Sequence, residues 1–186
     1  MKKYLFTLLI ILFVSLTTFA QKFWEQSTLS AGFDVTKSYK VAILPVFSGN
    51  IELTGNKNIF DAVYNKINLE LTASSKFQVL PKFAVEQAVN KFRYGSSVTI
   101  DPSKYNDLAK ELKVDLLVIC ELSNDKQMIK KKEIGTVMAY IQVFNMKNEA
   151  LVAYSGKARA INPISAEAEA EFAAQKALRV LMDKMK

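Results

Sequence analysis

The segment at residues 114–120 constrains the fold of this chain more than any other. It is apolar on both faces of an extended backbone, and Asp115 is its one charged residue. A strand with that pattern is buried on both sides, which places it centrally in a sheet covered by helices. A second apolar run at residues 40–46 predicts another buried strand, which ends near Pro45.

Helical spacing of apolar residues predicts the elements that cover this sheet. Asn58 is expected to cap the first helix, Asp101 followed by Pro102 opens the third, and Pro163 with Ser165 opens the last. The acids Glu167, Glu169 and Glu171 are interpreted as the solvated start of that last helix. The expected helices cover residues 58–71, 83–92, 101–112 and about 163–186.

The remaining strands are shorter or alternate in polarity. Residues 77–80 form a short strand, and residues 136–146 and 149–160 form a hairpin that turns at Lys147 and Asn148. The order is strand, helix, strand, helix, helix, then three strands and a helix. That order predicts an α/β fold: a single layered domain, with a mixed sheet of about five strands and helices packed on it.

The first residues have the pattern of a cleavable secretory signal peptide. Two lysines precede an apolar run, and small residues follow up to Ala20. The alternative is a retained anchor, but the run is short for a spanning helix, which needs roughly 20 residues. We expect a signal peptide at residues 1–20, an N-terminal arm at 21–39 and the α/β domain at 40–186. The arm aromatics, such as Trp24 and Phe33, either pack on their own domain, which we favour, or reach a partner.

Composition excludes several classes of chemistry. The chain has no histidine, which removes histidine-based triads and the commonest zinc ligand. Its single cysteine, Cys120, lies in the central apolar strand and is interpreted as a small buried hydrophobe. No nucleotide-binding or hydrolase motif is present. The sequence therefore predicts a protein that is not an enzyme and has no cofactor or metal.

Charge suggests two candidate contact sites. The net charge is +7, and +5 once residues 1–20 are removed, which favours contact with membrane lipids or wall polymers. Export argues against nucleic acid as the partner. The first candidate is a basic loop, which could instead be an ordinary solvated hairpin loop. The second is an aromatic–arginine cluster, which could instead be side chains that pack at the end of a helix. Their residues are Lys126, Lys130, Lys131 and Lys132 for the loop, and Phe92, Arg93 and Tyr94 for the cluster.

Short motifs at residues 41–45, 77–80, 108–118 and 143–152 resemble those of an envelope superfamily that includes the TolB amino-terminal domain, CsgG and LpoB. Residues 41–45, VAILP, resemble its VAVLPF opening, and FQVL at 77–80 resembles its next strand. LAKELKVDLLV at 108–118 and VFNMKNEALV at 143–152 resemble its later helix–strand and hairpin motifs. Lys113 and Asn148 stand where the family usually has glycine, and its lipid-bearing cysteine is absent.

The resemblance implies an anticodon-binding-like α/β layer used for protein–protein interaction, without shared catalytic residues. It implies an accessory protein of the cell envelope that supports assembly, secretion or wall synthesis. Its expected partner is another envelope protein, a homo-oligomer is possible, and the expected location is the periplasm, with outer-membrane association possible.

Two alternatives stay open. One is a subunit of a CsgG-like secretion channel, although the one long hairpin that the sequence predicts, at residues 136–160, is needed for the core sheet. The other is an envelope hydrolase that uses two carboxylates.

Overall fold

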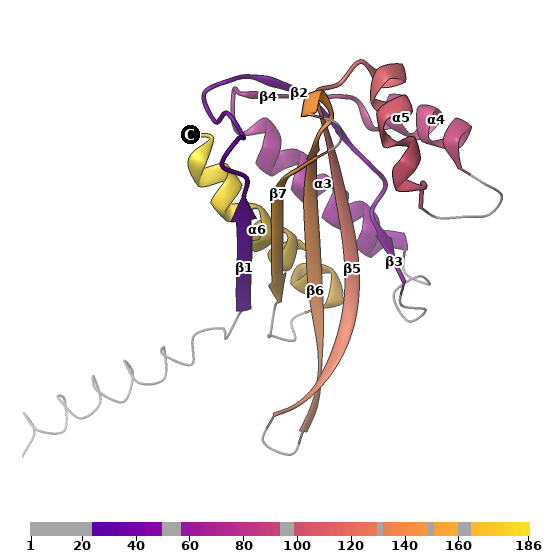
Figure 1. The fold of residues 1–186 in the computed structure, drawn as a ribbon. Helices are drawn as coiled ribbons and strands as arrows, with labels where there is room; N and C mark the ends of the chain where they lie inside the picture. The colour runs from indigo at the N-terminus through magenta and orange to yellow at the C-terminus, as the bar shows by residue number, and fades with distance from the viewer. Residues whose placement is uncertain (1–23, 50–56, 94–98, 130–131, 149–150, 160–164) are drawn as a thin grey trace, which may run out of the picture.

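The computed structural model describes residues 24–49, 57–93, 99–129, 132–148, 151–159 and 165–186 (Figure 1). They form a seven-stranded sheet in the order β1-β7-β6-β5-β2-β4, with β3 also pairing with β5. The strands are β1 (Trp24–Leu29), β2 (Tyr39–Ile43), β3 (Phe47–Ser48), β4 (Phe77–Val79), β5 (Leu116–Ile129), β6 (Lys132–Asn145) and β7 (Leu151–Arg159). The helices are α3 (Lys57–Thr72), α4 (Lys82–Phe92), α5 (Tyr105–Leu112) and α6 (Ala166–Lys184), with short 3-10 turns η1 (Pro102–Lys104) and η2 (Met146–Asn148).

The sheet is mixed, as the sequence predicts. Strand β2 runs parallel to β4 and β5, whereas β5, β6, β7 and β1 pair antiparallel. The number of strands is larger than the five expected, because β1 and β3 were not foreseen. Strand β1 lies within residues 21–39, the segment expected to be an arm, and its six residues pair with β7 along their whole length. Its sequence is mostly polar between Trp24 and Leu29, so hydrophobic periodicity gives no signal for it.

Helices cover the two faces of the sheet unequally. Helices α3 and α6 pack against each other, α6 covers β6, β7 and β1, and α3 contacts β2 and β4. Helices α4 and α5 contact β2 and β5 from the other side, in a second hydrophobic cluster. The expected central strand β5 is buried on both faces, since Leu117 and Val118 belong to different clusters.

The interpretation of Cys120 is confirmed. Its side chain is fully buried in the larger cluster, and burial raises the pKa of the thiol. A thiol in that setting is unreactive. Two helix starts are also confirmed: the Asp101 carboxylate accepts a hydrogen bond from Ser103 N at 2.9 Å, and Ser165 Oγ accepts one from Ala168 N at 3.1 Å.

Two expectations about helix starts were wrong. Helix α3 begins at Lys57, so Asn58 lies inside it instead of capping it. Glu169 is not solvated, because its side chain is buried at 8% exposure, and burial raises the pKa of its carboxyl group. Glu167 and Glu171 on the same helix are half-buried.

Strands β5 and β6 form a long hairpin in place of the expected loop at residues 126–132. They pair without a break from Leu116 with Asn145 to Ile129 with Lys132. Strand β7 follows β6 only as far as Met138, so the far part of the hairpin extends beyond the rest of the sheet (Figure 1). The sequence does not predict this extension, because residues 123–127 are all polar and lack the alternating apolar pattern of a strand. No helix within the described ranges is long and apolar enough to cross a membrane.

Candidate functional site

One face of the β1–β7–β6 sheet is not covered by any helix among the described residues. Neighbouring side chains along a strand point to opposite faces, and Tyr154 and Ala158 of β7 belong to the core under α6. Ser155, Lys157 and Arg159 therefore point away from α6. In Figure 1 the three strands lie in front of α6, and no described helix covers their near side. We call this surface the open face.

The open face is defined by alternate residues of three strands. Gln26 and Thr28 on β1 are exposed, and the residues on β6 and β7 are half-buried. The β6 residues lie opposite the buried set Val137, Ala139, Ile141 and Val143, which the sequence predicted correctly as the core side. The open face consists of Gln26, Thr28, Met138, Tyr140, Gln142, Ser155, Lys157 and Arg159.

The strand register arranges these side chains in rows across the sheet. Gln26 pairs with Lys157, which pairs with Tyr140, and Tyr140 pairs with Glu121 of β5. The Ser155 hydroxyl lies 3.3 Å from the Tyr140 hydroxyl and bonds to it. Tyrosine, methionine and arginine are residue types that are enriched in protein interfaces. The open face therefore has the mixed composition of a protein-binding surface.

Apolar side chains border the open face where β6 and β7 approach α5. Val152 pairs with Phe144, and the Phe144 ring meets the Tyr105 ring edge to face at 5.3 Å. Leu151 and Val152 are 64% and 40% exposed. Exposed apolar residues beside a polar surface extend the area that a partner can bury.

A groove of about 410 Å³ lies where the C-terminal ends of α3 and α6 meet. Its polar groups hold the two helix ends together: Ser74 Oγ donates to Met185 O at 3.0 Å, and Gln175 Nε2 donates to Glu70 Oε1 at 2.8 Å. Lys76 Nζ donates to the carbonyl of Val35 at 2.9 Å. Because these groups are engaged in structural bonds, the groove is better explained as a seam than as a reaction site.

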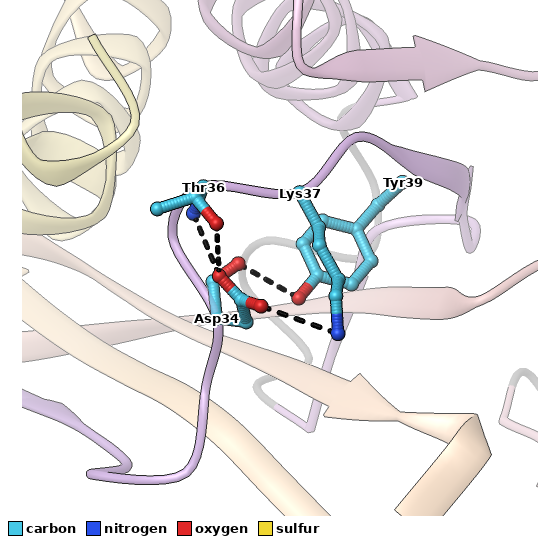
Figure 2. A network of polar contacts seen from close by, with 4 residues as sticks. All are labelled: Asp34, Thr36, Lys37 and Tyr39. Carbon is cyan, nitrogen blue, oxygen red and sulfur yellow. Dashed lines mark hydrogen bonds and ion pairs between the residues drawn. The ribbon is translucent and has the colours of Figure 1, made fainter.

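A polar network around Asp34 shapes the connection from β1 to β2 (Figure 2). Asp34 Oδ1 accepts hydrogen bonds from Thr36 N at 2.9 Å and Thr36 Oγ1 at 2.6 Å, and Lys37 Nζ lies 3.2 Å from Oδ2. These hydrogen bonds, with Lys37 nearby, lower the pKa of Asp34 to about 2. Tyr39 stacks on Phe33 at 5.0 Å and donates its hydroxyl proton to Asp34 O. The network is that of a local turn, which an ionised aspartate stabilises.

Asp115, directly before the start of β5, joins three segments. Its Oδ2 accepts from Lys40 N at 2.9 Å, its Oδ1 lies 2.8 Å from Lys147 Nζ, and its carbonyl accepts from Met146 N. Burial acts to raise the pKa of Asp115, but the bonds from Lys147 and Lys40 outweigh it and lower the pKa. This carboxylate is therefore a structural clamp that stays charged at neutral pH.

The described residues do not form a catalytic constellation. The acids with lowered pKa values, such as Asp34, Asp115 and Glu111, lie on separate elements and pair with nearby donors. No three of the described aspartate, glutamate and cysteine side chains are grouped so that they could hold a metal ion.

The candidate residues from the sequence lie apart from the open face. Phe92 ends α4 and packs against the cluster under α4 and α5, and Arg93 follows it with a buried Nε that has no hydrogen-bond partner. Tyr94 lies outside the described residues. Lys126 and Lys132 lie in paired strands, which corrects the expected loop; Lys130 and Lys131 are outside the described residues. Sequence reasoning missed the open face, although the polar residues that alternate with the apolar side of residues 136–146 could have indicated it.

Comparison with solved structures identifies related folds. The PelC dodecamer from Paraburkholderia phytofirmans is 12% identical, with a TM-score of 0.53, over 86% of this chain and 97% of that one. A lipoprotein from Neisseria meningitidis is 12% identical, with a TM-score of 0.51, over 76% and 96%. The LpoB C-terminal domain from Salmonella enterica is 10% identical, with a TM-score of 0.50, over 72% and 88%.

These similarities confirm the expected fold class and an LpoB-like fold. They extend over most of this chain, but identities this low establish the fold alone. The likeness to CsgG and TolB stays a prediction. No protein-family model and no curated protein matches the sequence.

Proposed function

We propose that this protein is an exported, non-catalytic accessory protein of the cell envelope, which binds another envelope protein through its open face. The observation that carries the proposal is the open face of β1, β7 and β6, which no described helix covers. Its side chains include Tyr140, Met138 and Arg159, residue types that are enriched in protein interfaces. The signal-peptide pattern that the sequence predicts at residues 1–20 and the LpoB-like fold support the envelope assignment. The periplasm is the proposed compartment, with outer-membrane association as an extension.

Binding also fits the chemistry of the described residues better than catalysis does. An envelope hydrolase that uses carboxylates needs two of them converging in a cleft. The groove between α3 and α6 contains Glu70 and Asp183, but Glu70 is engaged by Gln175 and Lys66, and Asp183 by Lys186. We therefore propose no reaction for this groove.

Site-specific crosslinking in intact cells tests the proposal. A photo-reactive amino acid at Thr28, which is exposed on the open face, should capture one defined envelope protein. The same group at Asn106, which is exposed on α5, is the matched control and should capture that protein much less. Equal capture from both positions, or no defined product from Thr28, would contradict binding through the open face.

A charge reversal tests whether the partner binds the open face or another part of the surface. Lys157→Glu should weaken the crosslink from Thr28 several-fold, because the substitution inverts the charge in the row that contains Gln26 and Tyr140. Lys110→Glu on α5 should leave the crosslink unchanged. Thermal unfolding of both variants checks that the fold is intact.

The long β5–β6 hairpin favours a second candidate, a subunit of an oligomeric secretion channel. The sequence predicts one long hairpin, at residues 136–160, whereas the structure also has the longer β5–β6 hairpin, with 14 residues in each strand. A solved structure of similar fold is a dodecamer. Resistance of the protein to carbonate extraction, together with a ring-like native mass, would favour the channel. Extraction as a small soluble species would exclude it.

We further propose that Lys126, Lys130, Lys131 and Lys132 make a peripheral contact with anionic lipid or wall polymer. Lys126 and Lys132 lie in the outer part of the described hairpin, and Lys130 and Lys131 stand between its two strands in the sequence. Replacement of all four by glutamine should reduce co-sedimentation with anionic vesicles and leave binding to neutral vesicles unchanged, since each lysine near such a surface contributes about 1 kcal/mol. Unchanged sedimentation with anionic vesicles would contradict the proposed contact.

A further inference from the structure

Strand β1 ends the described sheet on one side, and no other described strand pairs with its outer edge. The opposite edge strand, β4, has three residues, whereas β1 has six and pairs with β7 without a register shift. Natural edge strands are usually protected by proline, by lysine or another charged side chain, by a bulge or by short length. Residues Trp24–Leu29, with the sequence WEQSTL, contain no proline, lysine or bulge, and their one charged side chain, Glu25, is paired with Arg179.

The backbone groups that point outward from β1 follow from its pairing. Ser30 N donates to Ala153 O at 2.8 Å, so Ser30 and Ala153 form a hydrogen-bonded pair. Hydrogen-bonded pairs alternate along an antiparallel ladder, so Thr28 with Ser155 and Gln26 with Lys157 are such pairs too. The N–H and C=O groups of the intervening residues therefore face away from β7. These residues are Glu25, Ser27 and Leu29.

This edge is complementary to itself. When two copies meet antiparallel about a two-fold axis at Ser27, Ser27 lies opposite Ser27 and Glu25 lies opposite Leu29. Within the described strand, that is the register that uses all three outward-facing residues of both copies. It also separates the two Glu25 carboxylates, whose direct pairing would be repulsive.

A second observation at the same edge concerns Glu25. Its Oε1 accepts two hydrogen bonds from Arg179, at 3.1 and 2.9 Å, while its Oε2 is buried without a hydrogen-bond partner. A buried carboxylate oxygen left unsatisfied is costly. A strand added beside β1 brings further polar groups of the second copy close to Glu25. The Ser27 hydroxyl is not one of them, because it already bonds to Tyr154 within its own copy.

We infer that two copies of this chain pair through the outer edge of β1, centred on Ser27, to form one continuous sheet across the dimer. The interface is isologous, because the same edge is used by both copies. Each matched pair of outward-facing residues exchanges two backbone hydrogen bonds. The open faces of the two copies then lie side by side on one surface, so the inference goes beyond the proposed partner binding without depending on it.

Proline at the centre of the edge tests this pairing. Ser27→Pro removes an N–H that makes no bond to β7, and edge strands tolerate proline at such positions. The full chain recovered from cells should sediment as a dimer, and S27P should sediment as a monomer with the wild-type circular dichroism. Ser27→Ala, which keeps the N–H, should remain a dimer. A monomeric wild type, or a folded S27P that remains a dimer, would overturn the inference.

Cysteine crosslinking decides the question even if S27P fails to fold. In the inferred register Ser27→Cys faces its own copy at a Cα separation of about 5.5 Å, which a disulfide spans. Thr28→Cys is more exposed but is displaced from its copy by two residues along the strand, beyond that reach. Native Cys120 is fully buried and does not interfere. Oxidation should give covalent dimers of S27C and not of T28C; equal yields, or no S27C dimer, would overturn the inference.

Discussion

The hydroxyl of Tyr154 on β7 donates a hydrogen bond to the carbonyl oxygen of Ala177 on α6, at 2.5 Å. Gly156, two residues further along β7, faces the same carbonyl, and a Cβ at that position would collide with it. The strand and the helix are therefore held in close contact on one side. This contact assigns one side of β7 to the core and leaves Ser155 and Lys157 on the open face.

Gly156→Ala should destabilise the protein by about 1–3 kcal/mol. The added methyl group meets the backbone of α6 instead of a flexible side chain, so the helix or the strand must shift. Ser155→Ala, one residue away on the open face, should change stability by less than about 0.5 kcal/mol. Urea unfolding of both variants measures the difference. A G156A variant as stable as S155A would show that α6 does not pack this closely.

Loss of the hydroxyl group should affect the stability of the protein differently at two buried tyrosines. Tyr154→Phe removes a hydrogen bond to Ala177 and should cost about 1 kcal/mol. The hydroxyl of Tyr64 is buried without a hydrogen-bond partner, so Tyr64→Phe should be neutral or stabilising. Denaturation midpoints of the two variants provide the comparison, and an equal loss in both would refute it.

The same tyrosines predict a loss of stability at alkaline pH. Burial raises the pKa of Tyr64 and of Tyr154 to about 12, above the ordinary value of 10.0. Between these values the unfolded chain has lost protons that the folded protein keeps, so stability falls as pH rises through this window. Unfolding followed at about pH 9 and about pH 11 should show the fall. The fall in stability should be smaller in Y154F. The same fall in Y154F as in the wild type would show that Tyr154 does not contribute to it.

Central elements of the fold were predictable because their signals are local. Residues 40–46 and 114–120 are apolar on both faces, and this alone places them in a covered sheet. The caps at Asp101 and Ser165 follow from side chains that bond to the backbone two or three residues away. These features do not depend on which distant segment lies beside them.

The missed elements are those whose partners lie far away in the chain. Strand β1 and the outer part of β5 are polar and are held by backbone pairing with β7 and β6, which leaves no periodic pattern in the sequence. The open face was hidden for a related reason. The apolar side of β6 was evident, but whether its other side is covered depends on where α4, α5 and α6 pack.

Lys113→Gly should stabilise the protein by about 0.5–1 kcal/mol. Lys113 ends α5 with φ 53 and ψ 50, a left-handed conformation that strains any residue with a Cβ. Its N–H still donates to Lys110 O, and glycine keeps that bond. Part of the relief is offset by the greater freedom of glycine in the unfolded chain. Lys110→Gly, inside the same helix, should instead cost about 1 kcal/mol, and thermal unfolding of the pair distinguishes the two effects.

The Asp115 clamp should make the protein sensitive to acid in a way that one pair of substitutions isolates. Asp115→Asn loses the ion pair with Lys147 and should cost about 1 kcal/mol at neutral pH. The folded pKa of Asp115 lies below the ordinary value of 3.8, so its contribution is present above that value and is lost as pH falls through the folded pKa. The stability difference between wild type and D115N should therefore shrink in acid. Lys147→Gln should cause most of the same loss of stability as Asp115→Asn, because both substitutions remove the same ion pair. The double variant should therefore be little less stable than either single variant. Fully additive losses at neutral pH would mean that Asp115 and Lys147 stabilise the protein independently.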